Sequence, residues 1–135
     1  MNMRDAAMVT TLLWCSIDSD GEPLDRNYDH SALWREDRQK LQEQFYTWSD
    51  AADDILIANN CGHLSLDEIL GDKAEHLYIL VREGHGISMT DDWSPERKEY
   101  KACQQLERIA RAQGELNPYV GDDGKIYLSG LTAAN

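Results

Sequence analysis

A stripe of apolar side chains in the second quarter of the chain constrains the fold most strongly. Successive members lie seven, four, three, four and three positions apart, and they are Trp34, Leu41, Phe45, Trp48, Ala52 and Ile55. This spacing places all of them on one face of an α-helix. Ser31 is the expected N-cap, and the Asn-Asn-Cys-Gly sequence from Asn59 is the expected end, because Asn and Gly readily adopt left-handed backbone geometry. The pattern predicts one long helix from Ser31 to Asn59, or two helices with a break near Ser49.

The segment LYILVREGHGISMTDDW, Leu77 to Trp93, predicts a β-hairpin. Glu83-Gly84 suits its two-residue turn, because a positive φ costs glycine little. In this register one face of the hairpin carries four ionisable side chains, and they are His76, Arg82, His85 and Asp91. The first arm is apolar on both faces, which is typical of a central strand covered on both sides.

Shorter signals add further elements. The apolar run Met8–Cys15 is compatible with a strand or with a short helix. Ser65 to Glu68 matches a capping box that opens a short helix. Ser94-Pro95 is expected to start another helix that ends at Gly114.

The last segment, PYVGDDGKIYLSG at residues 118–130, predicts a second hairpin around a Gly-Asp-Asp-Gly turn. We therefore expect one α+β domain, residues 1–135. Its small, mostly antiparallel sheet of two hairpins would pack against three to four helices.

Charge is the strongest signal in the composition. The formal net charge is −12, with 25 acidic and 13 basic residues, and residues 1–75 contribute −10 of it. Direct nucleic-acid binding needs clustered Lys and Arg and is not expected. The acidic half suggests a partner protein with a basic surface, including a nucleic-acid-binding protein that carboxylates could block by mimicking phosphates. The alternative is that the acidic surface only keeps the protein in solution.

Many of the carboxylates lie in the turn-rich loop SIDSDGEPLDRNYDH, residues 16–30. The candidate binding residues in this loop are Asp18, Asp20, Glu22 and Asp25. A calcium loop of the EF-hand type is not expected, because Ser16 and Asn27 stand where two essential ligands belong. We expect an ordered turn, and a docking surface that Glu36, Asp37, Asp53 and Asp54 extend.

Cysteine usage and hydropathy indicate a cytoplasmic protein without cofactors. Cys15, Cys61 and Cys103 are scattered and odd in number, so no disulfide framework is expected. Cys61 and His63 could supply two metal ligands, but no second pair at a suitable spacing completes a zinc site. No apolar run approaches the about 18 residues of a membrane span, and the first residues lack the layout of a signal peptide.

Three motifs resemble a family of small proteins common in bacteriophages and on plasmids. They are Leu13-Trp14 followed by Gly21–Tyr28, then Arg82–Gly86, and finally Gly121–Lys125, and the resemblance covers about residues 12–28 and 75–129. The chain departs from the family pattern at Ile79, Ser88-Met89 and Asp91-Asp92, where the family carries a Trp, a Gly-Phe pair and an Asp-Arg pair. The family has no established biochemical activity. The resemblance implies an origin on a mobile genetic element and an accessory role, such as countering host defence.

Three functions follow as hypotheses. The first is a non-enzymatic binding protein that inhibits or modulates a host or phage protein with a basic surface, inside the bacterial cell. The second is a small-molecule binder or an enzyme that uses the ionisable face of the first hairpin, because His beside a carboxylate allows acid–base chemistry and Arg binds anions. No nucleophile motif or phosphate-binding loop supports it. The third is a self-associating module, since four Trp and six Tyr can supply an aromatic interface.

Overall fold

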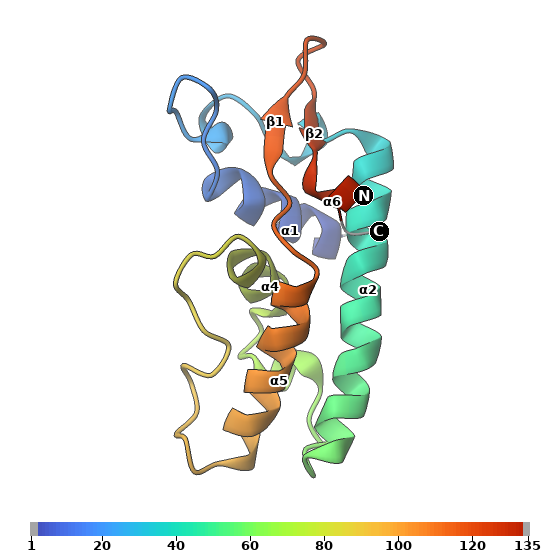
Figure 1. Ribbon diagram of the computed structural model, residues 1–135, viewed down its shortest axis with the longest axis vertical. Helices are drawn as coiled ribbons and strands as arrows, with labels where there is room; N and C mark the ends of the chain where they lie inside the picture. The colour runs from blue at the N-terminus through green and yellow to red at the C-terminus, as the bar shows by residue number, and fades with distance from the viewer. Residues whose placement is uncertain (1–2, 134–135) are drawn as a thin grey trace.

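Helix α2, Arg35–Ala58, runs along the long axis of the molecule and forms one of its sides in the computed structural model, which describes residues 3–133 (Figure 1). The helix is continuous, so the single-helix prediction is correct. Its buried residues follow the predicted stripe and are Leu41, Phe45, Trp48, Ala52 and Leu56. The helix begins after Trp34 rather than after Ser31, whose N–H is instead capped by the Asp29 carboxylate in the short 3-10 helix η2, His30–Ala32.

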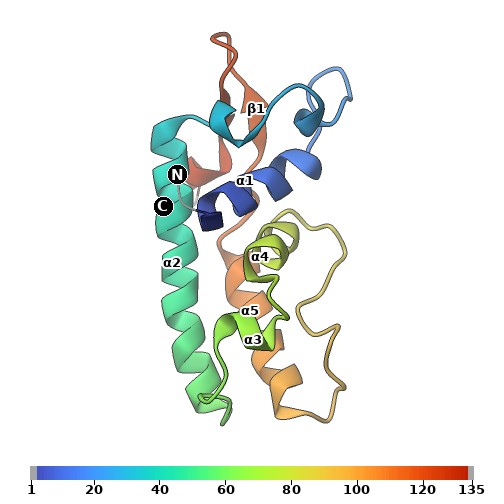
Figure 2. The ribbon, with the colours of Figure 1, turned by 180° about the vertical axis from the view of Figure 1, so that it is seen from behind.

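Helix α1, Met3–Trp14, contains most of the apolar run for which the sequence allowed a strand or a helix. Four of its side chains are completely buried, and they are Met8, Val9, Leu12 and Leu13. The chain then passes through a turn and the 3-10 helix η1, Leu24–Arg26, on its way to α2. Helix α1 therefore belongs to the core, where it lies against α4 (Figure 2).

The hairpin predicted for Leu77–Trp93 is not formed, because its first arm is helix α4, Ala74–Arg82. The glycine that was expected to make the turn ends this helix. Gly84 has φ +71°, its N–H donates to the Val81 carbonyl oxygen at 3.2 Å, and the His85 N–H donates to that of Leu80 at 3.1 Å. This pair of bonds is the Schellman motif of a helix C-terminus.

The hairpin prediction is wrong because α4 is buried on nearly all sides. The Tyr78 ring packs 5.1 Å from that of Phe45 and 4.8 Å from that of Trp48, while α1 and α5 cover the rest of the helix. A short helix that is surrounded in this way is apolar all round, and so is a central strand. Periodicity cannot distinguish the two.

Two further helices flank α4. The short helix α3, Leu66–Ile69, has both hydrogen bonds of the predicted capping box between Ser65 and Glu68. Helix α5, Lys98–Ala112, begins four residues after Ser94, because Ser94 to Arg97 form a separate turn. The loop of residues 83–97 connects α4 to α5 along one edge of the molecule (Figure 1).

The predicted second hairpin is present. Strands β1, Pro118–Val120, and β2, Ile126–Leu128, are antiparallel, with Tyr119 opposite Tyr127. The short helix α6, Gly130–Ala133, follows. Gly130 must be glycine, because a Cβ atom there would lie 1.9 Å from the Glu115 carbonyl oxygen. The fold is thus α+β with a small antiparallel sheet, and within residues 3–133 that sheet has these two strands alone.

No helix within residues 3–133 is both long enough and apolar enough to cross a membrane.

Candidate functional site

The face of ionisable residues predicted from the first hairpin is dispersed in the structure. Arg82 is 2% exposed and lies in the core. Its guanidinium donates to the carbonyl oxygens of Gly114 at 2.7 Å and Gln113 at 3.0 Å, and to side-chain oxygens of Gln44 and Tyr78. All of these acceptors are neutral, and two of them are at the C-terminal end of α5, whose helix dipole favours a cation. Arg82 therefore joins α4, α2 and α5 and presents no group to a ligand.

The two histidines of that face lie apart and have different partners. His85 is exposed, and its Nε2 lies 3.0 Å from the Cys15 carbonyl oxygen. His76 has its Nδ1 3.0 Å from the Thr11 hydroxyl, and its ring centroid is 6.2 Å from that of Trp14. Each histidine thus connects the region of α4 to α1 or to the residue that follows it.

Asp91 is exposed and lines a small pocket of about 170 Å³ together with His76. Arg82 and His85 do not line it. The structure therefore brings together two of the four predicted residues and separates the other two. Within residues 3–133 no hydrogen bond or ion pair joins His76 to Asp91, so they do not form the acid–base pair that the hypothesis required.

The acidic loop is an ordered turn, as the sequence predicts. One oxygen of Asp18 accepts the backbone N–H groups of Asp20 at 2.9 Å and Glu22 at 3.0 Å. Glu22 pairs with Arg26 at 3.1 Å on the surface. Asp18 and Glu22 therefore support the loop itself. Asp20 and Asp25 are exposed, and neither carboxylate has a hydrogen-bond or ion-pair partner in the described part of the chain.

The acidic docking surface expected from the sequence is split along α2. Asp37 is near the start of the helix and Asp53 is 16 residues later, which corresponds to about 24 Å along the axis at about 1.5 Å per residue. Asp37 also has a structural role, because its carboxylate accepts the Leu128 N–H at 2.8 Å. The loop carboxylates and Asp53-Asp54 therefore lie at different ends of the molecule.

A second acidic region contains Asp53 and Asp54, which the sequence predicts as part of the docking surface, together with residues that it does not predict. From Glu43 onward, α2 presents to solvent a surface that we call the acidic α2 face, which consists of Glu43, Tyr46, Asp50, Asp53, Asp54 and Ile57. Tyr46 is 43% exposed and Ile57 is 66% exposed. Among the residues that the structure describes, none of the four carboxylates has a hydrogen-bond or ion-pair partner.

The sequence contains the signal for this face. Tyr46, Asp50, Asp53 and Ile57 are spaced by four, three and four positions, so they share one side of a helix, as the core stripe does on the opposite side. Residues 41–72 contain seven acidic residues and no Lys or Arg. The charge of the first half of the chain as a whole does not distinguish this segment, so the sequence prediction includes only Asp53 and Asp54 of the face.

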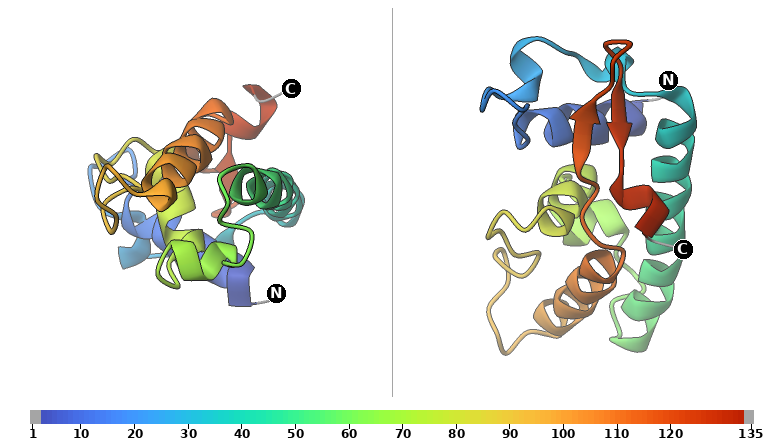
Figure 3. Two further views of the ribbon diagram at one scale, coloured as in Figure 1. Left: turned by 90° about the horizontal axis from the view of Figure 1, so that it is seen from below. Right: turned by 45° about the horizontal axis from the view of Figure 1, so that its top comes forward.

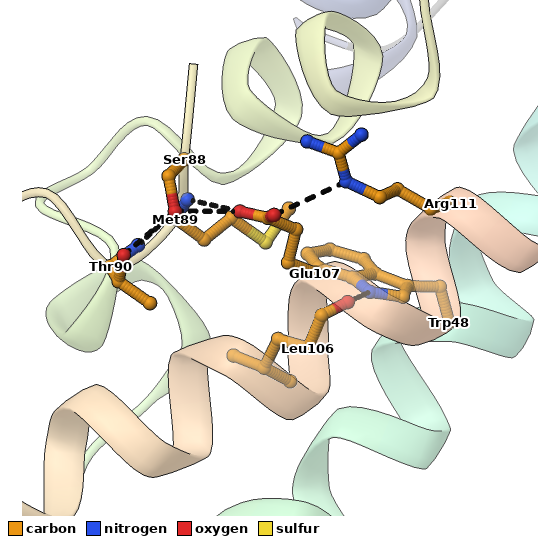
Figure 4. A network of polar contacts seen from close by, with 7 residues as sticks. All are labelled: Trp48, Ser88, Met89, Thr90, Leu106, Glu107 and Arg111. Atoms are coloured by element: carbon orange, nitrogen blue, oxygen red, sulfur yellow. Dashed lines mark hydrogen bonds and ion pairs between the residues drawn. The ribbon is translucent and has the colours of Figure 1, made fainter. Parts of the chain in front are cut away.

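A polar network joins the loop of residues 83–97 to α5 (Figure 4). One oxygen of Glu107 accepts the Ser88 hydroxyl and the Met89 N–H, both at 2.8 Å, and the other accepts Nε of Arg111 at 3.2 Å. The network borders an open pocket of about 330 Å³, which is also lined by Thr90, Tyr100, Gln104 and Arg108. The Ser88 hydroxyl donates to the Glu107 carboxylate and not to an imidazole, so the described residues do not form the Ser–His pair of a typical serine nucleophile. The Glu107 network therefore serves to hold the loop.

Thiol and metal chemistry find no support in the described part of the chain. Burial raises the pKa of the Cys103 thiol to about 12, so the sulfur is protonated at neutral pH and is a poor nucleophile. Across residues 3–133, no three side chains of His, Cys, Asp or Glu converge on a point where they could hold a metal ion.

Comparison with protein-family models, with curated protein sequences and with solved structures gave no match to this chain.

Proposed function

We propose that this chain is a non-enzymatic binding protein that docks on a partner protein through the acidic α2 face. The observation that carries the proposal is the set of four unpaired carboxylates that flank two exposed apolar side chains on one side of a long helix. The partner is a protein with a basic surface, and a nucleic-acid-binding protein belongs to this class because its phosphate-binding site is basic. The resemblance to proteins of phages and plasmids supports a role in modulating or inhibiting a host protein in the bacterial cytoplasm.

The two kinds of side chain on this face have different roles in the proposal. Carboxylates that have no intramolecular partner create a negative potential, which accelerates the encounter with a basic surface. Tyr46 and Ile57 supply the apolar contact that association needs, and Tyr is among the residues that most often dominate binding energy. Because α2 is anchored through its opposite side by Phe45 and Trp48, the face is presented on a rigid support.

The test compares variants that lose the same charge at two places. The first variant combines Asp50→Asn, Asp53→Asn and Asp54→Asn, and the matched control combines Asp20→Asn, Asp25→Asn and Asp91→Asn at exposed positions away from the face. Each tagged protein is used to capture partners from a bacterial lysate, and the affinity for the captured protein is then measured with purified components.

We expect the α2 variant to bind about tenfold more weakly or worse, and the control to bind like the wild type. Binding of the wild type should also weaken as NaCl rises from about 50 to about 300 mM, because exposed charges are screened. Equal binding by the wild type and the α2 variant would exclude this face. Loss in the control variant alone would instead assign docking to the loop residues predicted from the sequence.

A further inference from the structure

The start of α2 and the β-hairpin enclose a pocket whose charge is opposite to that of the molecule. The pocket has a volume of about 350 Å³ and is lined by Ser31, Leu33, Trp34, Arg35, Arg38 and Lys125. Half of these residues are cations and none is acidic, although the chain as a whole has a net charge of −12. We call this site the cationic pocket.

Pairing between distant segments creates the pocket. Leu33 forms a parallel bridge with Ile126, and the Trp34 N–H donates to the Ile126 carbonyl oxygen at 2.8 Å. These contacts hold β2 near the start of α2 (Figures 1 and 3), and Lys125, the residue before β2, lines the same pocket as Arg35. The Lys125 ammonium lies over the Trp34 ring, 4.9 Å from its centroid.

No cation of the pocket forms an ion pair with a carboxylate of the described residues, although Asp5 attracts Arg38 and Asp123 attracts Lys125 electrostatically. Among the described residues, no carboxylate lies within 4.0 Å of Arg35, Arg38 or Lys125. Arg38 donates from Nη2 to the Leu33 carbonyl oxygen at 2.9 Å, whereas its Nε is buried and has no acceptor within residues 3–133.

The acidic residues nearby are engaged with other donors. Asp37 accepts the Leu128 N–H, Asp29 accepts the N–H and hydroxyl of Ser31, and Asp123 accepts the Tyr127 hydroxyl at 2.6 Å. Glu36 is exposed and does not line the pocket. The cations therefore lack a direct ion-pair partner among the described residues, and an external anion can supply one.

We propose that the cationic pocket binds a phosphate group, either as free phosphate or as the phosphate of a small ester. Guanidinium groups match the oxygens of a phosphate in fork geometry, and the ammonium adds a point charge. The first turn of α2 contributes in the same direction, because Trp34 supplies no side-chain cap and the N-terminal N–H groups of a helix favour anions. A phosphate dianion uses three cations more fully than a carboxylate does. The aromatic face of Trp34 is occupied by Lys125, so the site recognises the charged group and not a stacked base.

The pocket is independent of the acidic α2 face. Arg35 is the first residue of α2, and the acidic face begins at Glu43, about two turns further along the helix. Failure of either proposal leaves the other intact, because their variants do not overlap.

Calorimetric titration of the full chain with inorganic phosphate tests the proposal, with NaCl adjusted so that the ionic strength stays constant. The variants are Arg35→Gln and Lys125→Gln, both exposed, and the control is Lys40→Gln, an exposed cation of α2 outside the pocket. We expect each pocket variant to bind phosphate about tenfold more weakly and the control to bind like the wild type.

Two further titrations identify the ligand class. Binding of methyl phosphate together with inorganic phosphate would indicate a phosphate ester, and binding of inorganic phosphate alone would indicate free phosphate. The proposal is overturned if the wild type shows no binding, if acetate binds as tightly as phosphate, or if Lys40→Gln weakens binding as much as the pocket variants do.

Discussion

The role of Arg82 depends on where its side chain lies, and its residue type alone does not reveal that role. The sequence places Arg82 beside His85 at an exposed hairpin tip, whereas the structure buries it among carbonyl and amide oxygens. A buried guanidinium is tolerated only when its donors are satisfied, and here Gln44, Gln113 and Gly114 supply the acceptors. Arg82 therefore stabilises the fold and is not available to bind a ligand.

Replacement of Arg82 by Ala should lower the free energy of unfolding by about 3 kcal/mol, because buried acceptors lose their charged donor. Arg82→Lys should recover only part of this loss, since one ammonium cannot reach acceptors on both α2 and α5. The control is Arg108→Ala on the exposed side of α5, with an expected effect within about 0.5 kcal/mol. Urea denaturation measures all three, and a loss below about 1 kcal/mol for Arg82→Ala would show that the bonds contribute little.

At the scale of elements, local signals succeed where the partners of a residue are close in sequence. Ser65 and Glu68 satisfy each other across three residues, and the capping box predicted from them is present. Ser31 and Ser94 were also expected to cap helices, but α2 and α5 begin after Trp34 and Arg97. A serine before a helical pattern is therefore a weak signal, and its combination with Glu three residues later is a strong one.

The difference between these serines is measurable. Ser65→Ala should lower the free energy of unfolding by about 1 kcal/mol, because the Glu68 N–H loses its acceptor. Ser94→Ala should change it by less than about 0.5 kcal/mol, since the Ser94 side chain caps no helix. Thermal or urea denaturation of the two variants side by side provides the comparison. Equal destabilisation by both would mean that the capping box adds nothing to the stability of α3.

The error at α4 has a different origin. Tyr78 to Val81 are buried on every side by elements that come from both earlier and later parts of the chain. The identity of α4 thus depends on tertiary neighbours, which a short apolar run does not specify. Gly84 after an apolar run is a signal for the end of a helix, but the same glycine fits a hairpin turn equally well.

At the scale of the whole molecule, the α+β class, the long helix and the C-terminal hairpin were predictable, because each rests on periodicity or on turn residues in one segment. The candidate sites were predictable only in part, since the sequence indicated Asp53 and Asp54 but not the other residues of the two sites. The cationic pocket needs Arg35 and Lys125, which a bridge between Leu33 and Ile126 brings together. The acidic α2 face lies within one predicted helix, so the spacing of the residues on the polar side of that helix is enough to predict it. The residues of the cationic pocket are far apart in sequence, so only the fold brings them together. The acidic α2 face becomes evident when the charge of its own segment is counted separately from that of the first half of the chain.

The net charge of the whole molecule makes its stability depend on pH and salt. With −12 at neutral pH, self-repulsion opposes the compact state, and protonation of His and carboxyl groups relieves it. Burial raises the pKa of the Glu83 carboxyl, and the hydrogen bond from the Leu116 N–H offsets only part of that effect. A carboxyl whose pKa is raised by folding binds its proton more tightly in the folded state. Its ionisation therefore lowers the free energy of unfolding as the pH rises from the unfolded pKa, about 4.3 for Glu, through the folded one.

Four other carboxyls with hydrogen-bond partners act in the opposite direction at lower pH. Hydrogen bonds lower the pKa values of Asp29, Glu68, Glu99 and Asp123. The stability that these groups contribute is complete above their unfolded pKa values, about 4, and is lost as the pH falls through the lowered ones. The protein should consequently be most stable between these two regimes, on the acidic side of neutrality.

We therefore expect the free energy of unfolding to be higher at about pH 5.5 than at about pH 8 when the ionic strength is about 20 mM. At about 0.5 M NaCl the part due to self-repulsion should largely disappear, and the part due to burial of Glu83 should remain. Glu83→Gln keeps an oxygen to accept the Leu116 N–H and removes the ionisation, so it should reduce the pH dependence that persists in high salt. Urea denaturation at both pH values and both salt concentrations measures these effects. A wild type that is more stable at pH 8 in low salt would contradict the role of net charge, and an unchanged slope in Glu83→Gln would show that the buried carboxyl does not contribute.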